Sequence, residues 1–171
     1  MTGEDFKKEV FPLKNKIFRF AKRLMTIHAE AEDITQDVFV KLWNRKQALA
    51  SMNSIEAYAM TVTRNLCLDK IKSRKTVIVE FPKQELELRD ADPRAQSELS
   101  NHKRLMNTII NGLPEQQRAV IQLREVEGYE FEEIAEITGS NINAVRANLS
   151  RGRKTIKEEL VKIYGYGLKN N

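Results

Sequence analysis

Residues 131–160 read FEEIAEITGSNINAVRANLSRGRKTIKEEL, and this stretch decides how the C-terminal part of the chain folds. Four residues at helical spacing predict the inner face of a short helix: Phe131, Ile134, Ala135 and Thr138. Gly139 then supplies the left-handed residue with which helices often end. Asn141 can cap a second helix, so the stretch predicts two helices joined by a tight turn.

The second helix carries its own apolar stripe, formed by Ile142, Val145, Leu149, Ile156, Leu160 and Ile163. Gly152 falls near this stripe and allows close approach of a neighbouring helix. A small residue at 135, a glycine four positions later and Val145 six beyond it match the spacing of a helix-turn-helix motif.

The opposite face of the second helix is polar and basic, and its projecting residues are Asn143, Arg146, Ala147, Ser150, Arg151 and Lys154. Between residues 141 and 163 there are six bases and two acids. We expect this face to bind DNA, with Arg146 at a base edge and Arg151, Arg153 and Lys154 mainly at phosphates. The alternative is a solvated basic helix in a bundle.

The rest of the chain is also helical in pattern. Helical spacing in the first segment is shown by Val10, Leu13, Ile17, Phe20, Ala21 and Leu24. The segment 29–46 has a further stripe, with acids at its start and bases at its end, as the helix dipole favours. A loop is expected at 47–54, after which Ser54 caps a helix running to about Lys72.

Residues 76–97 contain two prolines and no clear period, which predicts a linker with a short extended piece at Val77 to Phe81. Helical pattern resumes near Ser97, stops at Gly112, and restarts with Pro114 at the first helical position. The predicted fold is therefore all-α, with small helical domains at 1–75 and 98–165 and a frayed tail.

Composition narrows the class of protein. With 41% hydrophobic and 31% charged residues and a net charge of +5, the 171-residue chain is expected to be globular and soluble. It has one cysteine, so it can form no internal disulfide, and a reducing compartment is indicated. Apolar runs are too short to insert in a membrane, and the N-terminus does not resemble a signal peptide, so we expect a cytoplasmic protein.

Enzyme chemistry finds little support in the sequence. His28 and His102 are far apart, without neighbouring cysteines or paired acids, and are interpreted as surface histidines. Cys67 lies in an apolar stretch and is interpreted as a buried small hydrophobe. Neither a phosphate-binding loop nor a nucleophile motif is present, so we expect no catalytic residues, metal or cofactor.

Three segments, read in order, resemble the extracytoplasmic-function sigma factors of the sigma-70 family. They are AEDITQDVFVKLW (31–43), AYAMTVTRNLCLDKIKSRK (57–75) and LPEQQRAVIQLREVEGYEFEEIAEITG (113–139), followed by the basic helix. The chain is too short for the extra domains of housekeeping sigma factors, which agrees with this group. One departure is Ala147-Asn148, where the family often carries Ser-Arg, so the minus-35 sequence does not follow from the resemblance.

The resemblance implies two binding surfaces in the N-terminal domain. The first helix motif looks like the one that docks on the clamp coiled coil of the polymerase beta-prime subunit, with polar contacts from Asp33, Gln36, Asp37 and Lys41. Plain solvation and a helix-dipole role for the acids are the alternative.

The helix 54–72 and the loop before it resemble the part that reads the melted minus-10 strand. This implies a base or backbone contact for Asn65, phosphate contacts for Arg64 and Lys72, and weaker candidates in the variable loop at Ser51, Met52 and Asn53. The linker resembles the segment that threads the polymerase channel, although a plain acidic tether explains its composition nearly as well.

The resemblance implies a sigma factor that binds core RNA polymerase and promoter DNA, and that is usually held inactive by an anti-sigma partner. Two other classes stay open from the residues alone. One is a helix-turn-helix regulator with an N-terminal sensing domain, and the other is a protein whose helical faces bind only other proteins.

Overall fold

The computed structural model describes residues 1–77 and 98–165 of the chain. Within these ranges the regular elements are helical, and the all-α prediction is confirmed. The predicted linker and tail lie almost wholly outside the described residues. One boundary was wrong, because the helix expected to end near Lys72 continues to Val77, where the extended piece was expected to begin.

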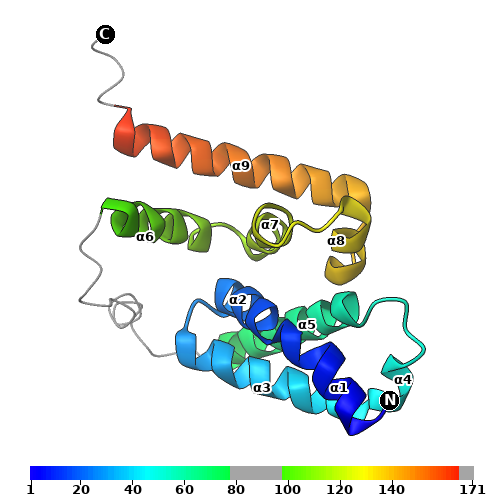
Figure 1. The fold of residues 1–171 in the computed structure, drawn as a ribbon. Helices are drawn as coiled ribbons and strands as arrows, with labels where there is room; N and C mark the ends of the chain where they lie inside the picture. Colours follow the sequence, from blue (N-terminus) through cyan, green and yellow to red (C-terminus); the bar gives the residue numbers. More distant parts are fainter. Residues whose placement is uncertain (78–97, 166–171) are drawn as a thin grey trace.

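The N-terminal domain packs its longer helices around one apolar core. Its elements are α1 (Gly3–Val10), η1 (Phe11–Leu13), α2 (Lys14–Met25), α3 (His28–Asn44), α4 (Lys46–Leu49) and α5 (Ile55–Val77). Helix α2 lies against both α3 and α5 (Figure 1). The fully buried side chains at the centre include Ile17, Phe20, Leu24, Val38, Leu42 and Met60.

Two local predictions in this domain needed correction. The apolar face from Val10 to Leu24 is not one helix, because a 3₁₀ turn containing Pro12 separates α1 from α2. Proline lacks the backbone N–H that an uninterrupted helix requires. The expected loop at 47–54 is partly helical, since α4 enters it, but the cap is confirmed: Ser54 Oγ accepts a hydrogen bond from the Ala57 N–H at 3.0 Å.

The C-terminal domain contains α6 (Glu98–Asn111), α7 (Glu115–Ile121), η2 (Gln122–Val126), α8 (Phe131–Thr138) and α9 (Ile142–Tyr164). Gly112 follows the last residue of α6, as predicted, but Pro114 is the N-cap of α7 rather than its first residue. Gly152 allows α9 to meet α7, because a Cβ added there would lie 3.0 Å from Ile121 Cγ1. Ile163, expected in the apolar stripe, is 48% exposed.

The two domains lie against each other, with α2 and α5 facing α7 and α8 (Figure 1). Arg23 on α2 binds side-chain oxygens of three C-terminal residues. Its Nε, NH1 and NH2 groups donate at 3.0, 3.0 and 3.1 Å to Gln122, Asn111 and Asn107. Burial, together with repulsion from Arg118, lowers the pKa of Arg23. Amide oxygens here take the place of water around a largely buried guanidinium.

A second polar cluster lies further along the same interface. Arg19 forms two hydrogen bonds of 2.8 Å with Glu127. Glu56 accepts hydrogen bonds of 2.5 Å from both Lys16 and the Tyr129 hydroxyl. Burial alone would raise the pKa of Glu56, but these two hydrogen bonds outweigh it and the pKa is lowered. Burial, and then the bond to Glu56, raises the pKa of Tyr129, which is therefore the neutral donor.

None of the helices in the described ranges combines the length and the hydropathy needed to cross a membrane.

Candidate nucleic-acid interface

The turn between α8 and α9 has the conformation expected from its sequence. Gly139 adopts the left-handed conformation with φ of 62°, and Asn141 Oδ1 accepts a hydrogen bond from the Ala144 N–H at 2.8 Å. The predicted inner face of α8 was partly wrong. Ile134 and Ile137 are buried there, whereas Phe131, Ala135 and Thr138 are only half-buried.

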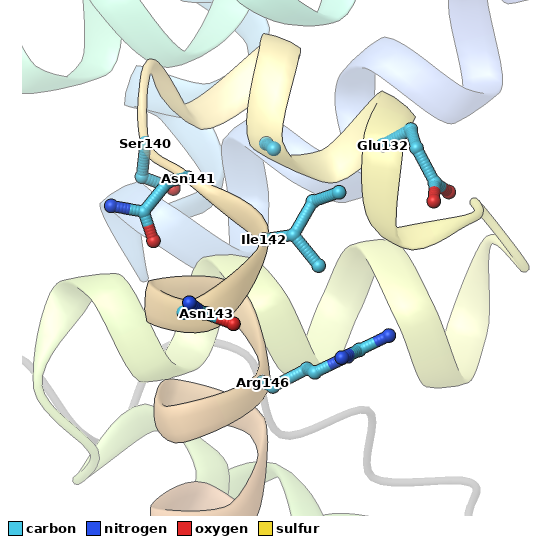
Figure 2. A pocket seen from close by; sticks show the side chains of 7 residues that line it. Glu132, Ser140, Asn141, Ile142, Asn143 and Arg146 are labelled. Atoms are coloured by element: carbon cyan, nitrogen blue, oxygen red, sulfur yellow. The ribbon is translucent and has the colours of Figure 1, made fainter.

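The predicted DNA-binding residues gather on one side of α9. Six are exposed and Ala147 is half-buried; the exposed ones are Asn143, Arg146, Ser150, Arg151, Arg153 and Lys154. Where α9 begins, an open hollow of about 680 Å³ lies between α8 and α9 (Figure 2). It is lined by Glu132, Ala135, Ser140, Asn141, Ile142, Asn143 and Arg146.

Internal partners distinguish the basic residues of this face. Arg153 Nε donates to Glu125 Oε1 at 2.6 Å, so its charge is partly neutralised. Lys154 Nζ lies 3.9 Å from the Glu158 carboxylate, which is a loose pair between exposed side chains. Arg146 instead places its guanidinium 5.3 Å from the centre of the Phe131 ring. The face therefore offers its cations to a ligand unequally.

The residues expected to dock on polymerase form an exposed strip on α3. The strip consists of four exposed residues, Asp33, Gln36, Asp37 and Lys41. The Asp33 carboxylate lies 3.8 Å from the Lys70 Nζ on α5. Next to them the apolar side chains of Val40 and Trp43 are 58% and 44% exposed. Exposed apolar groups beside charges are typical of a protein-binding surface.

The predicted minus-10 residues are only partly brought together. Asn65 and Lys72 are exposed on α5, and in the preceding loop Ser51 and Asn53 are exposed while Met52 is half-buried. Their surface is therefore open at Asn65 and at the loop.

Arg64 does not share that surface in the described arrangement. It turns toward the C-terminal domain, where its Nε lies 3.7 Å from a carboxylate oxygen of Glu115 and its side chain is only 14% exposed. Sequence spacing gave no sign of this pairing, because the two residues belong to different domains.

The interpretation of the remaining reactive side chains agrees with the structure. Cys67 is fully buried, and burial raises the pKa of its thiol to about 12, so it is inert. His28 lies 3.2 Å from Glu32, and His102 Nδ1 lies 2.6 Å from the Tyr164 hydroxyl. Among the described residues no group of three or more histidines, cysteines or acids could hold a metal ion.

An all-α chain with a capped helix-turn-helix and a basic, exposed second helix defines the class of helix-turn-helix DNA-binding proteins. Comparison with known families identifies the particular group. Residues 12–77 match Sigma-70 region 2, and residues 103–156 match Sigma-70, region 4. The chain belongs to the extracytoplasmic-function group of the sigma-70 family.

Two relatives and one solved structure support this assignment. The chain is 26% identical to the ECF RNA polymerase sigma factor SigE of Mycolicibacterium smegmatis over 86% of its own length and 58% of that protein's. It is 28% identical to the RNA polymerase sigma-E factor of Streptomyces avermitilis, covering 91% and 85% of the two chains.

The solved structure is that of the sigma factor RpoE in complex with the anti-sigma factor NepR from Bartonella quintana. It superposes with a TM-score of 0.77 at 25% identity and covers 92% of this chain and 97% of that one.

Proposed function

We propose that this chain is a sigma factor that binds core RNA polymerase and directs promoter-specific initiation by recognising minus-10 and minus-35 elements. One observation carries the proposal: regions 2 and 4 of the family occur in order, and each presents an exposed surface suited to its role. In this mechanism the chain binds and positions DNA, and the polymerase supplies the metal and the chemistry.

The proposed division of labour follows the two domains, 1–75 and 98–165, joined by the linker 76–97. The strip on α3 contacts the beta-prime clamp helices, and α5 with its preceding loop captures the melted minus-10 strand. There the Asn65 amide pairs with an extruded base, while Arg64 and Lys72 follow the backbone. The outer face of α9 enters the minus-35 major groove, with Arg146 at a base edge and Arg151, Arg153 and Lys154 mainly at phosphates.

Arg64 can take this role only after a rearrangement, because its guanidinium faces Glu115 across the domain interface. Contact with a promoter strand therefore requires α5 to separate from the start of α7. The chain would then exist in a closed arrangement, in which Arg64 faces Glu115, and in an open one on polymerase.

An anti-sigma partner is part of the proposal. The similar RpoE structure was solved with the anti-sigma factor NepR, at 25% identity over almost the whole of both chains. A protein partner that stabilises the closed arrangement would keep Arg64 covered. The site of action is the cytoplasm, where polymerase and promoters meet.

Charge reversal on α3 tests the docking surface. Asp33→Lys with Asp37→Lys should weaken affinity for core RNA polymerase about tenfold, since unlike charges at an interface become like charges. Glu132→Lys with Glu136→Lys is a matched control, because it makes the same change at exposed i, i+4 positions on α8. Affinity is measured without DNA, by fluorescence anisotropy of the labelled full chain.

Two results would count against the proposal. If the wild-type chain does not bind core polymerase, it is not a sigma factor, and a regulator acting without polymerase fits better. If the folded α3 variant binds core polymerase as tightly as the wild type, the docking residues are wrongly assigned.

A further inference from the structure

Two arginines on one flank of α9, Arg146 and Arg153, both reach back to the segment that precedes it. They are seven residues apart, which is close to two helical turns, so they project in nearly the same direction. Arg153 binds the Glu125 carboxylate, with its Nε donating at 2.6 Å. Arg146 contacts the Phe131 ring. The two contacts leave the arginines with different capacities for DNA.

A carboxylate binds the edge of a guanidinium and occupies N–H donors that a two-pronged contact with a base would need. Arg153 is in that state. An aromatic ring instead attracts the cation through the face of the ring and need not consume its N–H donors. Within the part of the chain that the structure describes, Arg146 makes no hydrogen bond or ion pair, and its side chain is exposed. The ring contact therefore restrains the Arg146 guanidinium and leaves its N–H donors available to a ligand.

The Phe131 ring is itself well fixed. Phe131 is the first residue of α8, directly after Glu130, whose backbone N–H and side chain form a capping box with Glu133. A second guanidinium, that of Arg124, lies 4.7 Å from the ring centre. Arg124 is anchored in turn, donating to the Tyr129 carbonyl oxygen at 2.7 Å and to Glu130 at 3.0 Å. The ring therefore has little freedom to move away from Arg146.

The position of Arg146 makes this contact relevant to DNA. Its side chain leaves the first turns of α9 and extends beside the hollow between α8 and α9 (Figure 2). The N-terminal part of a recognition helix is the part that usually contacts base edges. A free arginine must lose considerable side-chain entropy to hold a two-pronged contact with guanine, and a contact that restricts it beforehand reduces this loss.

We propose that Phe131 is a positioning residue for promoter recognition: its ring holds the Arg146 guanidinium ready, with its donors free, for one base of the minus-35 element. The proposal rests on the assignment of Arg146 to a base edge. It makes Phe131 a determinant of base preference although Phe131 itself touches no base. Arg153, which is bound by Glu125, contributes positive charge near the DNA backbone but does not affect base preference.

The test uses the full chain bound to core RNA polymerase and a library of promoter duplexes with a randomised minus-35 element. Base preferences are measured for the wild type, Arg146→Ala, Phe131→Leu, Phe131→Tyr and the double variant Phe131→Leu/Arg146→Ala. We expect Arg146→Ala to lose about tenfold preference at one position. Phe131→Leu should lose about two- to fivefold at the same position, since it removes one exposed cation–π contact. Phe131→Tyr keeps an aromatic face and should retain the preference.

A purely structural role for Phe131 predicts a different pattern. Phe131→Leu would then weaken binding to every sequence equally, and thermal unfolding of the same samples would show the loss of stability. In the double variant we expect no further loss of preference beyond that of Arg146→Ala, because Phe131 acts only through Arg146.

The outcomes separate the two assignments. If Arg146→Ala loses its preference at one position but Phe131→Leu keeps it, or if Phe131→Leu sharpens it by releasing Arg146, the positioning role is wrong and the base contact stands. If Arg146→Ala keeps the wild-type preference everywhere, the base contact is wrong, and the positioning role is overturned with it.

Discussion

The two surfaces proposed to contact DNA differ in how completely the free chain presents them. The basic face of α9 is exposed and assembled within one helix-turn-helix. The minus-10 surface on α5 is divided: Asn65 is exposed, whereas Arg64 is only 14% exposed and faces Glu115 in the other domain. A surface formed within one motif is ready as soon as the motif folds, but a surface that lies partly in a domain interface depends on how the domains are placed.

The interface that covers Arg64 has specific chemistry. Arg23 donates to three amide oxygens of the C-terminal domain, and Arg19 forms a two-pronged contact with Glu127. Such contacts fix one mutual orientation more strictly than apolar contact alone, because hydrogen bonds are directional. When these contacts are removed, Arg64 should therefore become exposed, and the minus-10 surface should be as accessible as the basic face of α9.

The largest effect is expected from Arg23→Ala. This change removes three hydrogen bonds to a charged group and leaves their acceptors in the interface, at a cost of roughly 2–3 kcal/mol. We expect the fraction of molecules in the closed arrangement to fall and the fraction in an open one to rise, which increases the radius of gyration in X-ray scattering. Arg151→Ala is the matched control, since Arg151 is exposed on α9. An unchanged radius in a fully helical Arg23→Ala variant would show that this network does not hold the domains.

A smaller effect, about tenfold, is expected from Asn65→Ala on promoter opening. The amide contact forms only with extruded bases, so duplex binding should change little while open complexes form less well. Permanganate reactivity of unpaired thymines and duplex affinity separate the two steps. Asn44→Ala provides the same substitution at an exposed position on α3. Equal losses at both steps, or at neither, would contradict the minus-10 role.

Lys154→Ala should have a weaker and sequence-independent effect. Its proposed phosphate contact releases about one counterion, so the slope of log affinity against log salt should fall by about one unit for every duplex. Lys162→Ala serves as the control, because Lys162 lies further along α9 and pairs with Glu159 at 2.7 Å. A loss confined to particular base sequences would instead assign Lys154 to base recognition.

The smallest effect is expected from acid pH acting on Glu56. The folded state lowers the pKa of Glu56, so its stabilising contribution is present above the unfolded pKa and is lost as pH falls through the lowered one. The Glu56 side chain is 37% exposed, so solvent screening limits the effect to less than about 1 kcal/mol. The open fraction seen by scattering should rise slightly between about pH 5 and pH 3.

The Glu56→Gln variant should lack this acid-dependent step, while Glu136→Gln, at an exposed position on α8, should retain it. If the wild type and Glu56→Gln respond identically to acid, Glu56 does not contribute to the stability of the domain interface.

The sequence determined the features that depend on neighbours three or four residues apart. Gly139 ends α8, Asn141 caps α9 and Ser54 caps α5, and each acts through its own backbone or a hydrogen bond three residues away. The polar face of α9 followed from the same spacing. The corrections fell where local spacing competes with other terms, as at Pro12, which interrupts the first helix, and at Ile163, which is exposed although it keeps the apolar period.

Only the tertiary structure decided which polar side chains of the N-terminal domain are held by partners in the C-terminal domain. Arg64 faces Glu115, Glu56 binds Tyr129, and Arg23 binds residues more than 80 positions away. Hydrogen bonds and ring contacts depend on distances of a few ångströms, and such distances between domains follow from the packing of whole helices. No period or motif in the sequence encodes them, so the fold and its family were readable from the chain, and the covering of Arg64 was not.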